Sequence, residues 1–174
     1  IHHNARLPFG LPRHSMPRDI GILAVVQFTW GLGEGLFIFF YPLALQQWQI
    51  DPLQIGAVLS FLGVVMAVVQ APAGYLSDRF GPRPLIWAAY ILGVVAAVMM
   101  AAASSLPFFV AGLVAYSVTS FIVAPLNSYI TQMRGSWSAQ RGISFVSASF
   151  QVGAILGPML GGRIAQTAGL AEIF

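Results

Sequence analysis

Residues 84–133 read PLIWAAYILGVVAAVMMAAASSLPFFVAGLVAYSVTSFIVAPLNSYITQM and contain no charged side chain. A helix needs about 20 apolar residues to cross the hydrocarbon core of a bilayer, so this run is long enough for two spans. Ser104 and Pro107 favour a turn near its middle, which gives expected helices at 84–103 and 106–130. The stretch therefore predicts two adjacent membrane-spanning helices.

The same apolar character continues on both sides of this run. Further segments of spanning length lie at 20–45, 53–76 and 142–166, and we expect residues 169–174 to lead into a sixth span that this sequence truncates. Of the 174 residues, 57% are hydrophobic and only 7% are charged. Soluble domains carry about 25% charged residues, so this composition excludes them. The fold class predicted is an all-α membrane protein with five complete spans.

Arginine placement predicts the orientation. Counted across alternate connections, seven arginines fall on one side of the membrane and Arg163 alone falls on the other; the seven are Arg6, Arg13, Arg18, Arg79, Arg83, Arg134 and Arg141. The positive-inside rule then places the N-terminus in the cytoplasm of a multi-pass protein of the cell (plasma or inner) membrane. Residues 1–17 lack periodicity and are predicted to be a disordered cytoplasmic arm, with Met16 as a candidate start. The arginines form no patch, so nucleic acid is not an expected partner.

Polar side chains form stripes on three of the predicted helices. On the first, fourth and fifth spans, residues at helical spacing share one face. Such stripes suggest a common interior filled by water or substrate. The third span has almost nothing polar beyond Tyr90 and is expected to face lipid. The candidate substrate-cavity residues are Gln27, Trp30, Glu34, Tyr41, Ser120, Asn127 and Gln151.

Glu34 is the only acidic residue inside a predicted span. A charged side chain at mid-membrane costs about 2.5–3.5 kcal/mol on insertion scales. Two readings stay open for Glu34: it is a protonation site or a contact for a cationic substrate, or it makes a structural hydrogen bond to another helix.

Small residues form a second set of stripes. On the second span they recur at three- and four-residue steps at Gly56, Ser60, Gly63, Ala67, Ala71 and Gly74. On the fifth span Gly153, Gly157 and Gly161 step by four. Because small residues allow helix backbones to approach closely in lipid, both stripes predict tight helix contacts.

The connection between the second and third spans, GYLSDRFGPRP at 74–84, is the most specific motif. It resembles the signature loop of the major facilitator superfamily, a Gly-x-Leu-small-Asp-Arg-x-Gly-basic-basic pattern between helices two and three. Pro82 stands in place of the first basic residue. The resemblance covers the chain from about residue 18 onward, and the matching residues are Gly74, Leu76, Asp78, Arg79, Gly81 and Arg83.

This resemblance implies a six-helix N-terminal half built from inverted three-helix repeats, completed by a C-terminal half that the sequence lacks. A central site would open alternately to each side of the membrane. Asp78 and Arg79 would grip a helix end of the other half when the cytoplasmic gate is closed, and Gly74 would permit the close helix contact beside them.

A second motif lies in the fifth span. Its glycines and proline resemble the Gly-x-x-x-Gly-Pro-x-x-Gly-Gly pattern of drug/proton antiporters in the same superfamily, and they are Gly153, Gly157, Pro158, Gly161 and Gly162. Ser144 stands where the longer pattern has another glycine, and the fourth span lacks the arginine of many proton-coupled members. The resemblance implies a secondary transporter that exports small compounds in exchange for protons. The predicted cavity stripes are mildly polar with one acid, which fits neutral or cationic amphipathic compounds better than anions. Import of sugars, organic acids or other small metabolites is the alternative.

Other function classes fit less well. A membrane-embedded enzyme would need paired carboxylates, a Ser/His pair or metal ligands within the spans. The spans hold one carboxylate and neither His nor Cys, so no catalytic, metal or cofactor site is expected. A retinal protein needs a lysine for its Schiff base, and the chain has none. A channel or a non-transporting receptor of the same fold stays open.

Overall fold

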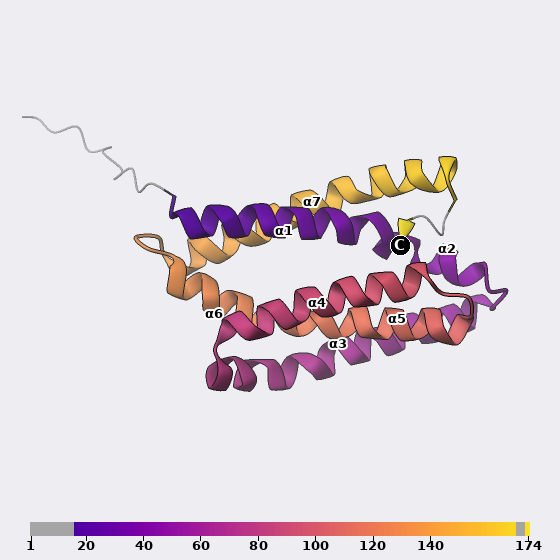
Figure 1. Ribbon diagram of the computed structural model, residues 1–174, viewed down its shortest axis with the longest axis horizontal. Coiled ribbons are helices and arrows are strands. Elements are labelled where there is room, and N and C mark those ends of the chain that lie inside the picture. Colours follow the sequence, from indigo (N-terminus) through magenta and orange to yellow (C-terminus); the bar gives the residue numbers. More distant parts are fainter. Residues whose placement is uncertain (1–15, 170–172) are drawn as a thin grey trace, which may run out of the picture.

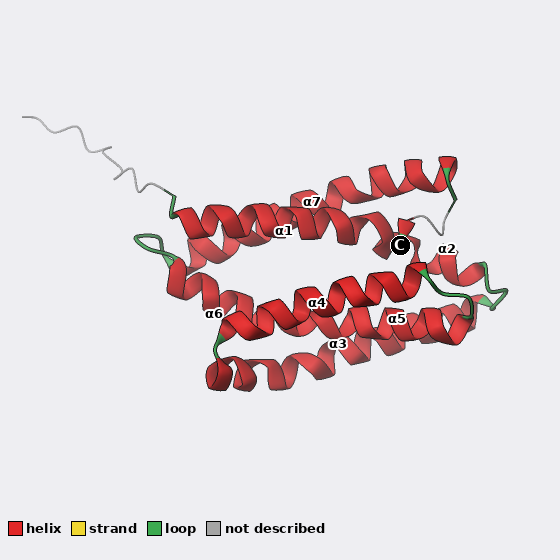
Figure 2. Cartoon of the chain, in the orientation of Figure 1, coloured by secondary structure: helices red, strands yellow, loops and turns green. Residues whose placement is uncertain are grey.

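A computed structural model describes residues 16–169 and 173–174 (Figure 1). Within those ranges every regular element is a helix (Figure 2). The expected all-α membrane fold is therefore confirmed. Residues 1–15 of the predicted cytoplasmic arm lie outside the described residues, as do 170–172 of the segment expected to lead into a sixth span.

Five helical spans in the described part are long and apolar enough to cross a membrane. Three are single helices: α3 (Pro52–Phe80), α4 (Pro82–Ala101) and α7 (Ala139–Thr167). Two contain a short 3-10 segment. The first joins α1 (Arg18–Phe37), η1 (Ile38–Phe40) and α2 (Tyr41–Gln46); the fourth joins α5 (Leu106–Val118), η2 (Thr119–Ile122) and α6 (Val123–Met133).

Prolines explain both 3-10 segments. Pro42 and Pro125 have no N–H, so the carbonyl groups four residues earlier, on Ile38 and Phe121, lose their ordinary helical donors. Ile38 lies in η1 and Phe121 in η2. The backbone tightens locally at these points and then resumes the α-helix, as short 3-10 stretches within helices commonly do.

Helix ends follow local sequence. At the start of α3, the Asp51 carboxylate accepts a hydrogen bond from the Gln54 backbone N–H at 2.8 Å, and the Gln54 side chain accepts one from the Asp51 N–H at 3.2 Å. This reciprocal pair is a capping box. The α3–α4 turn consists of Gly81 with φ of +80°, followed at once by Pro82. Glycine adopts a positive φ without strain, so Gly81 allows the chain to turn from α3 into α4 within a single residue.

The helices form two layers (Figure 1). α1 and α7 lie side by side along most of their length, and α3, α4 and α5 pack together in the second layer. Fewer residues are in contact between the two layers than within them. Five described arginines lie at the end of the bundle where α1 begins, whereas Arg163 lies near the C-terminal end of α7; the five are Arg18, Arg79, Arg83, Arg134 and Arg141.

The close helix contact predicted from small residues is present for one of the two stripes and absent for the other in the described part of the chain. For α7 the predicted close contact is confirmed, because a Cβ built on Gly157 would lie 2.6 Å from the Gly35 Cα of α1. For α3 it is not: around Gly56, Gly63 and Gly74, no atom of the described residues outside the glycine's own stretch of helix lies within 4 Å of a built Cβ. The α3 stripe is open on this part of the protein.

Candidate functional site

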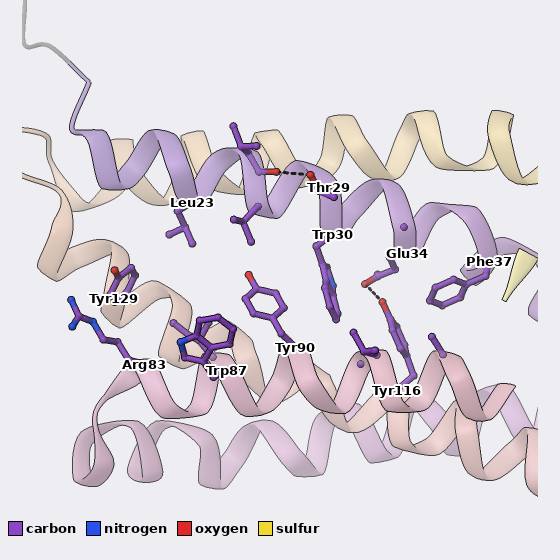
Figure 3. A pocket seen from close by; sticks show the side chains of 17 residues that line it. Leu23, Thr29, Trp30, Glu34, Phe37, Arg83, Trp87, Tyr90, Tyr116 and Tyr129 are labelled. Carbon is purple, nitrogen blue, oxygen red and sulfur yellow. Dashed lines mark hydrogen bonds between the residues drawn. The ribbon is translucent and has the colours of Figure 1, made fainter. Parts of the chain in front are cut away.

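A cavity of about 910 Å³ lies between α1 and α4 (Figure 3). Its wall is mostly apolar. α1 contributes Leu23, Val25, Val26, Thr29, Trp30, Gly33, Glu34 and Phe37; α4 contributes Arg83, Ile86, Trp87, Tyr90, Gly93, Val94 and Ala97; Tyr116 of α5 and Tyr129 of α6 complete it. Cavities of this size commonly accept drug-sized ligands.

Two hydrogen bonds from tyrosines to α1 cross between the layers at this cavity. The Tyr116 hydroxyl donates to Glu34 Oε2 at 2.9 Å. The Tyr90 hydroxyl donates to Gln27 Oε1 at 2.7 Å. Side-chain bonds between membrane helices contribute about 0.6 kcal/mol on average, since the polar groups find other partners when the helices separate. The two bonds therefore fix side-chain positions more than they stabilise the bundle.

Trp30 stands between the two tyrosines (Figure 3). Its ring centroid lies 5.0 Å from that of Tyr90 and 6.1 Å from that of Tyr116, with the Trp30 and Tyr116 planes 6° apart. Phe37 meets Tyr116 edge-on at 4.9 Å. An aromatic wall thus borders the one carboxylate of the cavity, and ring faces carry the negative potential that attracts cations.

The packing of α1 on α7 holds the Glu34 backbone in place. Gly35, the next residue, lies against α7 so closely that a Cβ built on it would be 2.6 Å from the Ala154 carbonyl oxygen and 3.0 Å from the Gly157 Cα. Pro158 has no N–H to donate to that Ala154 carbonyl. Cα–H groups of close-packed helices make weak bonds to such oxygens. The glycine and proline motif of α7 therefore contacts α1 beside the cavity carboxylate.

The residues predicted to share one substrate cavity do not all come together. Trp30 and Glu34 line the cavity, and Gln27 bonds to its wall through Tyr90. Tyr41 is buried next to Phe37, and its hydroxyl has no hydrogen-bond partner in the described part of the chain.

The other three predicted residues, Ser120, Asn127 and Gln151, are absent from the cavity lining. The Ser120 hydroxyl donates to the Met66 carbonyl of α3 at 3.3 Å, the Asn127 carbonyl accepts from the Thr131 hydroxyl at 2.8 Å, and Gln151 is exposed on α7. The stripes thus serve separate surfaces of the bundle.

The signature loop lies at the end of the bundle where α1 begins. Asp78 and Arg79 are exposed in the last turn of α3, and the Arg79 guanidinium lies 5.5 Å from the Phe80 ring. Arg83 lines the cavity mouth, where its guanidinium lies 5.6 Å from the Tyr129 ring. Of the signature-loop residues, Arg83 is the one that lines the cavity.

The prediction that the third span faces lipid all round is wrong for one side of α4. Tyr90 and Gly93, three residues apart and thus on one helix face, line the cavity opposite α1. That spacing was visible in the sequence, but a single tyrosine in an apolar helix is a weak signal. Tyr116 was also missed, since nothing in the sequence pairs it with a carboxylate 82 residues away.

Comparisons with known proteins agree with this architecture. A family model described as Major Facilitator Superfamily matches residues 23–174. The class C tetracycline resistance protein of Escherichia coli is 33% identical over 109 residues, which are 63% of this chain and 28% of that protein. The inner membrane transport protein YajR of Escherichia coli K12 is 27% identical over 158 residues, 84% of this chain and 34% of that protein. The class H tetracycline resistance protein of Pasteurella multocida is 23% identical over 152 residues, 86% of this chain and 38% of that protein. The chain thus spans about a third of the length of the curated relatives it matches.

Proposed function

The chain belongs to the major facilitator superfamily, and from this membership we propose that it forms part of a proton-coupled exporter of small neutral or cationic amphipathic compounds. It is a multi-pass membrane protein of a transporter family, and not an enzyme. Export by alternating access requires a second half that completes the substrate path. The names of the relatives support the direction of transport, since two of the three described above are tetracycline resistance proteins.

Glu34 in its aromatic cavity is the observation that carries the proposal. It lies mid-way along the first span, whereas the other acids of the described spans, Asp19 and Asp78, lie in terminal turns. A carboxylate within the membrane is expensive and therefore usually functional. Here it is placed among ring faces in a cavity large enough for a ligand. The same group can bind a cation when ionised and release it when protonated, which is the exchange an antiporter needs.

The glycine and proline motif of α7 also supports an exporter in which Glu34 binds the ligand. Its glycines bring α7 against α1 on both sides of Glu34, so the motif and the carboxylate belong to one packed unit. In this proposal Asp78 and Arg79 form the cytoplasmic latch, and their exposure at the end of α3 leaves them free to meet a helix of the other half. The N-terminus of α1 then faces the cytoplasm, together with the arginine-rich end of the bundle.

The test is export of a fluorescent lipophilic cation from cells that express the complete gene and lack their own exporters. We expect Glu34→Gln, which keeps the size of the side chain and its capacity to accept from Tyr116, to abolish export driven by a proton gradient. Asp19→Asn removes an exposed acid from the same helix outside the cavity and serves as the matched control. Unchanged export and unchanged pH dependence in Glu34→Gln would refute the proposal.

A further inference from the structure

Trp30 reaches from α1 across the cavity toward α4 (Figure 3). Tyr90 lies on one side of its indole, and the bonded pair of Tyr116 and Glu34 lies on the other. Tyr90 is itself tied to α1 through its bond to Gln27. Both aromatic neighbours of the indole are therefore held in place by hydrogen bonds to α1.

Gly93 provides the space that this orientation needs. A Cβ built on Gly93 would lie 3.0 Å from Trp30 Cζ2 and 3.2 Å from Cζ3, and closer still to Cη2. Ordinary van der Waals contact begins near 3.4 Å. The tip of the indole thus fills a notch in α4 that exists only because residue 93 has no side chain. Any larger residue there would push the indole off α4.

The space left open beside Trp30 has a defined chemistry. Glu34 supplies negative charge, and the aromatic rings of Trp30, Tyr90 and Tyr116, a side-chain type that attracts cations, line the same cavity. Apart from Thr29 and from Arg83 at the cavity mouth, the rest of the wall consists of aliphatic and aromatic side chains and glycines, including Phe37 and Val94. This combination fits an organic cation with a bulky apolar body, because a quaternary centre attracts ring faces without needing hydrogen bonds.

We propose that Trp30, seated against Gly93, sets the largest organic cation that the cavity accepts. The inference rests on the proposed function, because it requires the cavity to bind a transported ligand. With its tip in the notch the indole lies against α4, and the volume next to Glu34 stays open. An indole displaced from the notch occupies that volume. Gly93 is a positioning residue that acts through Trp30, and Trp30 is the residue that touches the ligand.

Gly93→Ala tests the notch directly, and the chain offers a matched control. Gly63, on α3, lies outside the cavity, and a Cβ built on it meets no atom within 4 Å beyond its own stretch of helix. Gly63→Ala therefore adds the same methyl group to another membrane-spanning helix without touching the cavity or the indole. A double variant, Gly93→Ala with Trp30→Phe, replaces the indole by a shorter ring that the new methyl group can accommodate.

The measurement is competition by a series of cations against export of a fluorescent cation, in vesicles that contain the complete protein. The series runs from tetramethylammonium through longer tetraalkylammonium ions to tetraphenylphosphonium. We expect Gly93→Ala to lower the ratio of apparent affinities, largest over smallest cation, by about tenfold or more, the discrimination that one misplaced methylene produces. Gly63→Ala should leave the ratio unchanged, the double variant should restore it, and Trp30→Ala alone should raise it.

A merely structural role for Gly93 would weaken all cations equally, so a uniform loss across the series contradicts the inference. An equal change of the ratio in Gly63→Ala contradicts it too. If Gly93→Ala does not accumulate in the membrane, Trp30→Ala decides, because an unchanged or lower ratio in that variant refutes size selection. Loss of export in Glu34→Gln together with an unchanged ratio in Gly93→Ala refutes the size inference alone, whereas full export in Glu34→Gln refutes the proposed function.

Discussion

Replacing Gly35 by alanine tests whether the α1–α7 contact holds the site together. A Cβ at Gly35 would lie 2.6 Å from the Ala154 carbonyl oxygen, 3.0 Å from the Gly157 Cα and 3.1 Å from the Ala154 Cα. All three are backbone atoms, so no side-chain rotation relieves the clash. Ordinary contact begins near 3.4 Å, and the helix axes must therefore move apart by several tenths of an ångström. Overpacking of this kind costs about 1–3 kcal/mol.

Gly33→Ala is the matched control on the same helix. Alanine gains about 1 kcal/mol over glycine in helix propensity, and this gain applies to both variants and cancels in their difference. Because nothing lies within 4 Å of a Cβ at Gly33, the difference isolates the clash. We expect Gly35→Ala to be less stable than Gly33→Ala by about 1–3 kcal/mol.

The assay is unfolding of the complete protein, purified in detergent, by titration with a denaturing surfactant. Helix content and tryptophan fluorescence report the transition. Equal unfolding free energies for Gly35→Ala and Gly33→Ala would refute the close contact between α1 and α7. A deficit confined to Gly35→Ala supports it, and a parallel deficit in Gly157→Ala, whose Cβ would lie 2.6 Å from the Gly35 Cα, tests the same contact from the α7 side.

Two further predictions concern orientation and helix initiation. These 174 residues contain 0 Cys, so once any cysteines elsewhere in the complete protein are replaced by serine, single cysteines at the exposed residues Ser104 and Ser136 can be labelled without background. We expect a membrane-impermeant maleimide to react with Ser104→Cys in intact cells and with Ser136→Cys only after lysis, and the reverse pattern would contradict a cytoplasmic N-terminus. Asp51→Ala removes the capping-box acceptor of α3 and should cost about 1 kcal/mol, measured by the same surfactant titration, with Ser104→Ala, in an exposed turn without a cap bond, as the control.

The sequence predicts the spans well because lipid imposes one requirement on all of them. A backbone that crosses hydrocarbon must satisfy its hydrogen bonds internally, so long apolar runs such as 84–133 become helices whatever their neighbours. The breaks within spans are also local, since Pro42 and Pro125 determine them through the missing N–H. The Gly153/Gly157/Gly161 stripe predicts a close helix contact for the same local reason.

The sequence does not show which helix each helix face packs against. The glycine stripe of α7 could not name α1 as its partner, because glycines at Gly31 and Gly35 are two among many in the chain. The polar stripe of α1 pointed to one interior shared with Asn127 and Gln151. In the structure Glu34 and Gln27 instead bond to tyrosines on α5 and α4, at separations of 82 and 63 residues. Periodicity fixes which residues share a helix face, and only packing fixes what that face meets.

One turn of α1 combines two requirements that oppose each other. Gly33 faces the cavity with open space around it, while Gly35 meets the α7 backbone so closely that no side chain fits. Between them Glu34 points into the cavity and accepts from Tyr116. Under the proposed function, in which Glu34 exchanges protons for ligands, the carboxylate needs room on its own side and a fixed backbone behind it. Two glycines around a single acid supply both, which explains why the acid lies in a Gly-Glu-Gly sequence and why the glycine motif of α7 lies opposite it.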